Sequence, residues 1–377
     1  MPGDDGLENS TTARVTASRN ICPAPNTRSL TFLFDPPGFL SDVQNFVNDP
    51  AMFRSQLGHY GALISGSFAL GFFRLTYKEV QRLDVFLEDG SGADEFASYL
   101  QETEKYQSDS QEVETTPRRR IYSRVLRPNM KLCMIRTTGP PTQDILTSPS
   151  TTAYVNFITW NKAFSIFPRQ TLIEHRFYPL KPLGNDFGVE LNELASQGWT
   201  ARDILWPDYA EDKLSGLVGV RRVGDGLSMV IPLDTNSVSP PWIPNYVIEC
   251  AQFDICDNGP RFGKSRTISS QFGRAHIANR APPWSFIQIR AKELRSPALH
   301  YSYTTGSTKW HDFVGERVRR WAWLELYKIE ERDRPVQSST SFPLVSEISI
   351  PQGFETPRSW DYADDQMPAW YQEWERK

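Results

Sequence analysis

The chain has 377 residues, of which 12% are aromatic and 11 are tryptophan, so it is long enough for one large or two moderate domains with a packed core. Its formal net charge of −4 excludes a surface that is basic throughout, which leaves RNA binding unsupported by charge. No apolar run approaches the roughly 20 residues of a membrane helix, and the polar N-terminal segment has no apolar signal core. We therefore expect no membrane association and a cytoplasmic or nuclear location.

The four cysteines are too few for a disulfide framework in a chain of this length, and they indicate a reducing compartment. Cys250 and Cys256 lie six positions apart, which is not the C-x2-C spacing of a zinc site. We expect ordinary buried thiols.

Proline, glycine and charge punctuate the chain into four expected parts. Residues 1–37 are rich in Ser, Thr, Asn, Asp and Pro, and predict a flexible tail. Residues 38–170 form an expected core of helices and strands, and residues 171–331 form a second, mixed α/β region. Residues 332–377 are a Pro- and Ser-rich, charged extension that ends in a short aromatic helix around Trp370–Trp374.

In chain order, the first half alternates predicted helices and strands. Ser41 is the predicted N-cap of a first helix, which runs up to Asp49-Pro50. The pattern then gives a helix Ala51–His59, an apolar strand Ala62–Ile64, a helix Phe68–Leu75, a strand Arg82–Leu87, a helix Asp94–Tyr106, strands Arg118–Val125 and Lys131–Thr137, and a helix that includes Asp144. The fold class is therefore α+β.

The stretch Gly61–Asp89 contains the residues that carry chemistry. A buried strand leads into Ser65-Gly66-Ser67 and then into a helix, and such a turn offers backbone N–H groups and a hydroxyl to a phosphate. Asp84 lies in the middle of the next strand, where its carboxylate could hold a divalent metal against that phosphate.

These residues resemble the nucleotidyltransferase fold of the polymerase-β type, whose signature is a Gly-Gly or Gly-Ser turn followed by a pair of acids separated by one residue. More narrowly, Ile64–Ser67 and Leu83–Leu87 are similar to an uncharacterised set of fungal proteins that read roughly ISGSxALxFF…SDLDVFV. The resemblance implies a small mixed sheet flanked by helices, with a nucleotide cleft that the second region completes.

One departure from the pattern changes its expected chemistry. Arg82 stands where the family has the first acid of the pair, and a guanidinium repels a metal ion instead of binding it. Arg82 could contact a phosphate directly, so Gly66, Ser67 and Arg82 are candidate nucleotide-binding residues. Asp84 is the candidate catalytic and metal-binding residue, with Mg²⁺ or Mn²⁺ as cofactor if the protein is active. Cys133 lies where a third acid is expected.

The stretch Thr151–Pro168 is also similar to the fungal set, which reads close to STTxxxNFIxxxKAYSLFP. Val155, Ile158 and Phe164 have a spacing that predicts a helix. The resemblance makes Asn156 and Lys162 candidates for nucleotide contact, and the alternative is that both stabilise helix packing.

Arginine-rich stretches recur along the chain. Arg118–Arg120 and Arg221–Arg222 are typical of exposed strand entries or turns, and either could instead contact a phosphate or RNA. Tyr246–Ile255, Ser285–Ile289 and Trp321–Ile329 alternate like strands. Arginines before the last of these could form a platform for single-stranded nucleic acid, with a core-facing strand as the alternative.

Three functions compete on this sequence. The first is a catalytically degenerate nucleotidyltransferase-like protein, a pseudoenzyme that binds a nucleotide or a protein partner. The second is an active transferase that moves a nucleoside monophosphate from a nucleoside triphosphate to a protein, a nucleotide or RNA, with acids recruited from elsewhere. The third is a structural or interaction protein without a ligand in the cleft.

Overall fold

The computed structural model describes residues 43–76, 80–108, 118–125, 127–182, 187–201, 217–257, 286–334 and 354–376. The predicted tail 1–37 and the predicted N-cap Ser41 lie outside these residues, as do parts of the second region and of the C-terminal extension.

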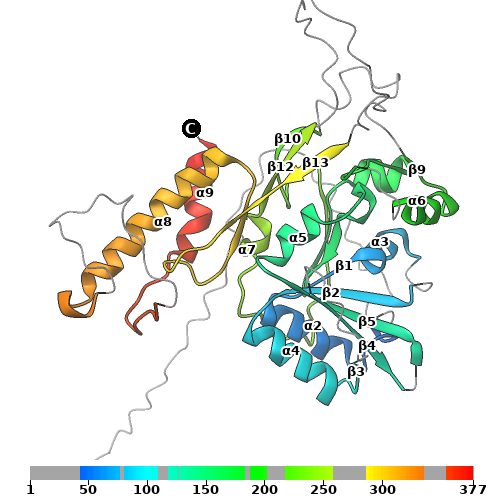
Figure 1. The fold of residues 1–377 in the computed structure, drawn as a ribbon, viewed down its shortest axis with the longest axis horizontal. Helices are drawn as coiled ribbons and strands as arrows, with labels where there is room; N and C mark the ends of the chain where they lie inside the picture. Colours follow the sequence, from blue (N-terminus) through cyan, green and yellow to red (C-terminus); the bar gives the residue numbers. More distant parts are fainter. Residues whose placement is uncertain are drawn as a thin grey trace, which may run out of the picture.

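An eight-stranded mixed sheet forms the centre of the molecule (Figure 1). Its strands, in spatial order, are β11 (Met229–Pro232), β7 (Lys162–Ser165), β6 (Asn156–Ile158), β1 (Leu63–Ser65), β2 (Arg82–Glu88), β5 (Arg127–Thr137), β4 (Arg118–Arg124) and β3 (Gln107–Ser108). β2 and β5 are parallel, and the other neighbouring pairs are antiparallel. β1, the strand before the Gly-Ser turn, lies between β2 and β6.

Helices α2 (Pro50–Tyr60) and α4 (Ser91–Glu102) cover one face of this sheet. Asp49 begins α2 because its carboxylate accepts hydrogen bonds from the backbone N–H groups of Ala51 and Met52, both at 3.0 Å. Apolar side chains of both helices pack against Leu83, Val85 and Leu87 of β2. Because side chains alternate along a strand, Arg82, Asp84, Phe86 and Glu88 lie on the opposite face.

α3 (Gly66–Arg74) contributes Phe68, Ala69 and Phe72 to the same core as α2 and α4. The opposite face carries α5 (Pro141–Thr147) and a second sheet, β10 (Gly219–Arg222), β12 (Gln252–Asp257) and β13 (Ile287–Arg290). A second core joins them, with Ile145 of α5, Phe157 and Phe164 of the main sheet, and Phe253 of β12. Beside α3 lie α6 (Phe187–Ser196) and the short parallel pair β8 (Arg176–Phe177) and β9 (Thr200–Ala201).

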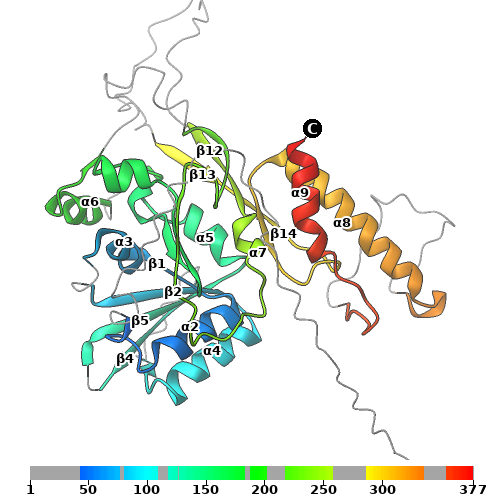
Figure 2. The same cartoon turned by 180° about the vertical axis from the view of Figure 1, so that it is seen from behind.

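The C-terminal part forms a separate layer beside the second sheet. It contains α7 (Tyr246–Glu249), the hairpin β14 (Lys292–Leu294) and β15 (Tyr303–Thr305), the long helix α8 (Thr308–Lys328) and the last helix α9 (Met367–Glu375). The remaining short helical turns are η2 (Thr152–Tyr154), η3 (Arg169–Ile173), η4 (Glu331–Asp333) and η6 (Asp364–Gln366). Figures 1 and 2 show α8 and α9 packed side by side, and a third core lies between them. The predicted aromatic C-terminal helix is therefore confirmed, and it packs on the molecule's own α8.

Three predicted elements are wrong, two entirely and one in its first half. The stretch around Asn156–Pro168 is a hairpin, β6 and β7, and not a helix. Its apolar residues also fit a strand, since Phe157 and Phe164 pair across the two strands with ring centroids 4.9 Å apart. Thr159 closes the turn by accepting a hydrogen bond from the backbone N–H of Lys162 at 2.9 Å.

The predicted strand Trp321–Ile329 is the second half of α8. Its alternating tryptophans gave the wrong period, whereas Val314, Val318, Ala322 and Leu326 repeat every four residues and form the buried face of a helix. The Ser307 hydroxyl caps that helix at the N–H of Trp310. The predicted strand Tyr246–Ile255 is also wrong in its first half, which is α7.

The other predicted helices and strands of the first half, from α2 to α5, agree with the structure to within a few residues at their ends. Cys133 and Cys250 are buried and Cys256 is half-buried, and none of these three cysteines forms a disulfide. In the part of the chain that the structure describes, no helix combines the length and the apolar character required to cross a bilayer.

Candidate functional site

Asp84 is held at the centre of the main sheet by its two neighbouring strands. It lies opposite Ser65 of β1 and opposite Cys133 of β5. The residue is only 5% exposed, although β2 runs to solvent at its Arg82 end. The register therefore brings the Gly-Ser turn, Asp84 and Cys133 together, as their places in the sequence suggested.

Position 66 requires a glycine for two reasons: its backbone has a positive φ, and the Asp84 carboxylate lies where a Cβ would be. The φ of Gly66 is +74°, in the left-handed region that favours glycine. A Cβ at this position would lie 2.5 Å from Oδ2 of Asp84, which is closer than two non-bonded atoms can approach. The Gly-Ser turn therefore packs directly against the Asp84 carboxylate, and α3 begins beside Asp84.

Arg82 pairs with Asp84 on the same face of β2. Its Nε lies 2.8 Å from Oδ1, and its Nη2 donates a hydrogen bond to Oδ2 at 3.1 Å. The Arg82 side chain is 59% exposed, while that of Asp84 is 8% exposed. Both carboxylate oxygens of Asp84 thus contact the guanidinium of Arg82, which belongs to the same strand. Arg82 stands at the position where the resemblance has an acid.

Burial dominates the electrostatics of this pair. It raises the pKa of Asp84 above its ordinary value, although Arg82 and, more weakly, Arg119 act in the opposite direction. Burial, and then the Asp84 charge, raise the pKa of the Cys133 thiol to about 11. Cys133 therefore carries a neutral thiol at neutral pH, in the place where the resemblance has a third acid.

A cavity of about 380 Å³ opens over these residues. The turn, the basic residues Arg82 and Arg119, the helices α5 and α6, and the segment between these helices contribute to its lining. The residues that line it are Ser65, Gly66, Ser67, Arg82, Asp84, Phe86, Arg119, Asp144, Ile145, Ser148, Pro149, Ser150, Tyr154, Val189, Glu190 and Glu193. Its size is at the lower end of the range for a small-molecule site.

Three further carboxylates line this cavity. Asp144 comes from α5, and Glu190 and Glu193 come from α6. Burial raises the pKa of Asp144 and of Glu190. Burial, and then Glu190 and Glu193, raise the pKa of Tyr154 to about 12, and the Tyr154 hydroxyl interacts with Ser67.

The residues present do not fit the two-metal arrangement that the resemblance would require. Among the described residues there is no group of three or more His, Cys, Asp or Glu side chains placed to hold a metal ion. Asp84 already contacts a guanidinium, and the acids of α5 and α6 do not gather around it.

Asn156 and Lys162, the two other predicted nucleotide-binding residues, do not line the cavity. Asn156 is 1% exposed, and its side-chain amide donates a hydrogen bond to the carbonyl of Ala153 at 2.6 Å. Its backbone carbonyl accepts a hydrogen bond from the Ser65 hydroxyl at 2.7 Å, so Asn156 helps to hold the Ser65-Gly66-Ser67 turn in place. Lys162 forms an ion pair with Glu249 of α7. Both side chains thus contact other parts of the protein, and they do so from a hairpin and not from the helix that the alternative assumed.

The structure adds site residues that the sequence pattern did not single out for this role. Arg119 belongs to the basic stretch Arg118–Arg120. The sequence allowed two interpretations of this stretch, an exposed strand entry or a contact with a phosphate or RNA. Asp144, Tyr154 and Glu193 carry no local signal, because they reach the cavity only through the packing of α5, η2 and α6 on the sheet.

No protein-family model, no curated protein and no solved structure matches this chain. The functional argument therefore rests on the site itself.

Proposed function

We propose that the cavity over Gly66, Ser67 and Asp84 binds a nucleotide through its phosphate and that the protein does not carry out metal-dependent nucleotidyl transfer. The observation that carries this proposal is the contact of Arg82 with both oxygens of Asp84, directly beside the Gly-Ser turn. It places a cation where a transferase of this type needs a metal-binding acid.

The phosphate-binding part of the proposal rests on α3. The first N–H groups of a helix have no partner within the helix, and they favour an anion placed at its N-terminus. Gly66 and Ser67 open that terminus toward the cavity, and Gly66 has no Cβ to obstruct it. Arg82 and Arg119 line the same cavity and can contact a phosphate.

The acidic lining of the cavity restricts which nucleotide fits. The lining contains four carboxylates (Asp84, Asp144, Glu190 and Glu193) against two guanidinium groups, a formal balance of −2. A triphosphate without a counterion would be repelled by this excess. Ribose hydroxyls and base amino groups, in contrast, can donate hydrogen bonds to carboxylates. We therefore expect a nucleoside monophosphate to bind at least as tightly as the triphosphate in the absence of divalent metal.

The test combines binding with transfer. Calorimetric titration with each nucleoside monophosphate and triphosphate, with EDTA or with Mg²⁺, measures affinity for wild type, Arg119→Gln and the control Arg320→Gln on α8. Incubation with α-labelled nucleoside triphosphates, Mg²⁺ or Mn²⁺, and total cell RNA or protein measures transfer for wild type and Asp84→Ala. We expect binding that Arg119→Gln weakens by about tenfold, as for loss of one charged hydrogen bond, and no label transfer.

Label that appears with wild type and disappears with Asp84→Ala would contradict this proposal and establish an active transferase. One observation favours that alternative: Asp144 lines the same cavity, and burial alone accounts for its raised pKa, so it is an acid available for recruitment.

Absence of binding for every nucleotide, with an unchanged melting temperature in all variants, would leave the third function, an interaction protein. The aromatic side chains of α9 are weak support for it, because Met367 and Tyr371 are buried against α8.

A further inference from the structure

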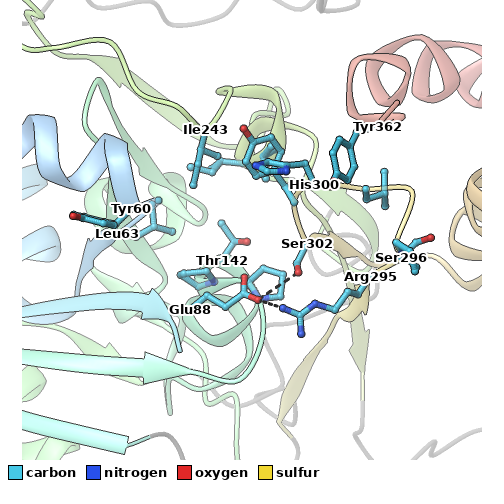
Figure 3. A pocket seen from close by; sticks show the side chains of 18 of the residues that line it. Tyr60, Leu63, Glu88, Thr142, Ile243, Arg295, Ser296, His300, Ser302 and Tyr362 are labelled. Carbon is cyan, nitrogen blue, oxygen red and sulfur yellow. Dashed lines mark hydrogen bonds and ion pairs between the residues drawn. The ribbon is translucent and has the colours of Figure 1, made fainter. Parts of the chain in front are cut away.

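A second and larger cavity, of about 690 Å³, lies between the main sheet and the C-terminal part (Figure 3). It is bordered by the end of β2, the start of α5, α7, and the segments 295–302 and 354–362. Its carboxylate is Glu88, which lies on the same face of β2 as Asp84 and about 13 Å further along the strand, at about 3.3 Å per residue. Phe86, between the two acids, lines the first cavity and not the second. The strand thus presents one carboxylate to each cavity.

The walls of the second cavity are mostly rings and aliphatic side chains. Three tyrosines contribute, and their hydroxyls already have protein partners: Tyr60 donates to Glu95 at 3.2 Å, Tyr301 donates to the carbonyl of Trp242 at 2.9 Å, and Tyr362 shares a hydrogen bond with Thr356 at 2.8 Å. What these tyrosines offer to a ligand is therefore the part of each ring that neighbouring rings leave open, and the His300 ring, which contacts Tyr301 and Tyr362, belongs to the same wall. Aromatic faces attract apolar groups and cations.

Glu88 supplies the polar end of the cavity. Its Oε1 accepts a hydrogen bond from Nη2 of Arg295 at 2.5 Å and lies 3.5 Å from the Ser302 hydroxyl, and Figure 3 shows the three side chains pointing toward one another. Within the described residues, no partner is found for its Oε2. Burial raises the pKa of Glu88, Arg295 opposes this rise, and the nearby Glu293 adds to it.

The surroundings of this polar end carry an excess of negative charge. Glu293 lies 3.8 Å from Nε of Arg295, and its own Oε1 is buried without a hydrogen-bond partner among the described residues. Asp364 does not line the cavity, but it accepts hydrogen bonds from the backbone N–H groups of His300 and Tyr301, which do. The described lining contains one arginine, Arg295, and no lysine. The Arg295 guanidinium thus interacts with two carboxylates, those of Glu88 and Glu293. A third carboxylate, that of Asp364, is bonded to the backbone of residues that line the cavity.

We propose that this second cavity is a binding site for a small organic cation, an amine on an aromatic or aliphatic body. The ammonium group would donate to Glu88 Oε2, and the body would lie against Tyr60, Tyr301 and Tyr362. The volume is within the range of about 300 to 1,000 Å³ typical of small-molecule sites. This site is independent of the nucleotide cavity, so either proposal can fail alone.

A matched set of three probes tests the assigned charge. 2-Phenylethylamine, 2-phenylethanol and 3-phenylpropionate share a phenyl ring and a similar chain, and they carry a positive, no and a negative charge. Ligand-observed NMR and calorimetry on the full chain give their affinities. We expect the amine to bind at least about tenfold more tightly than the alcohol, the size of effect for one charged hydrogen bond, and the carboxylate to bind most weakly.

Variants locate the binding. Glu88→Gln keeps the shape of the side chain and should weaken amine binding by about tenfold while leaving alcohol binding unchanged. Thr356→Trp fills the cavity from the 354–362 segment and should weaken all probes. Glu102→Gln, on the exposed side of α4, removes the same charge elsewhere and should have no effect. Melting temperatures measured for each variant identify any that fail to fold.

Equal affinity for amine and alcohol, tighter binding of the carboxylate, or no binding of any probe would each overturn the proposal. Amine binding that survives both Glu88→Gln and Thr356→Trp in folded protein would also overturn it, because the cation would then bind elsewhere.

Discussion

β2 carries two carboxylate–arginine pairs on one face, and they are built in different ways. Asp84 pairs with Arg82, two residues away in the same strand. Glu88 pairs with Arg295, which is 207 residues away in the sequence. The Asp84 side chain is 8% exposed, whereas that of Glu88 is 30% exposed and that of Arg295 is 65% exposed. Burial raises the pKa of both acids.

The local pair forms wherever β2 forms, because residues i and i+2 of a strand lie on the same face. It is therefore a property of the strand itself. The distant pair exists only when the segment after β14 docks on the end of β2. The first pair thus depends on local geometry alone, while the second depends on how two parts of the molecule meet. Four predictions examine this contrast.

The largest effect is expected at the turn that is built against Asp84. Gly66→Ala should lower the free energy of unfolding by about 2 to 4 kcal/mol, because the new Cβ meets the Asp84 carboxylate at a positive φ. Gly315→Ala on α8 is the matched control, since its Cβ would meet nothing within 4 Å. In a helix interior that change should stabilise by about 0.5 to 1 kcal/mol. Denaturant unfolding of both variants checks the pair, and similar values for the two would show that Gly66 is not constrained.

Arg82→Asp should convert the local pair into two carboxylates on one face of β2. We expect affinity for Mn²⁺ to rise at least about tenfold over wild type, or about 1.4 kcal/mol, because the repelling guanidinium is replaced by a ligand. Electron paramagnetic resonance of free Mn²⁺ measures this directly. The double variant Arg82→Asp/Asp84→Asn is the control and should lose the gain. If Arg82→Asp binds Mn²⁺ no better than wild type, Arg82 is not what prevents metal binding.

Asp84→Asn should stabilise the protein at pH 7 by about 1 kcal/mol, because it removes a buried charge that one exposed arginine compensates only in part. The folded-state pKa of Asp84 is raised, so the folded state holds this proton more tightly than the unfolded state does. The stability contributed by protonated Asp84 is therefore complete below the ordinary pKa of 3.8 and is lost as pH rises through the folded-state value. Thermal unfolding should thus show a larger advantage of the variant at pH 7 than at pH 3.5. An advantage that grows toward low pH would reverse the sign.

The smallest effect is expected for the distant pair. Glu88→Gln should change the free energy of unfolding by less than about 1 kcal/mol, since its arginine partner is largely exposed to solvent and salt. Urea unfolding at low and at high salt measures it, and Glu102→Gln provides the background of removing an exposed charge. A loss of several kcal/mol would show that this pair holds the C-terminal part onto the sheet.

Much of the candidate site could be read from one short stretch. Gly66, Ser67, Arg82 and Asp84 lie within 19 consecutive positions, and a strand, a turn, a helix and a second strand are enough to bring them together. The helix period failed elsewhere because Val155, Ile158 and Phe164 satisfy both a helix and a hairpin. Which one forms is decided by the neighbouring strands: β6 pairs with β1, and β7 pairs with β11.

The sequence by itself determined the alternating order of helices and strands from α2 to α5, the turn beside Asp84 and the place of Arg82 two residues before Asp84 on one face of β2. These features depend on residues that are close in the chain, where local periodicity and turn chemistry act directly. Only the tertiary structure decided that Arg119, Asp144 and Glu193 complete the first cavity, that Asn156 and Lys162 lie outside it, and that Glu88 meets Arg295 in a second one. Contacts of this kind join residues that are distant in sequence, and they form because whole elements bury their apolar faces together, which no local pattern specifies.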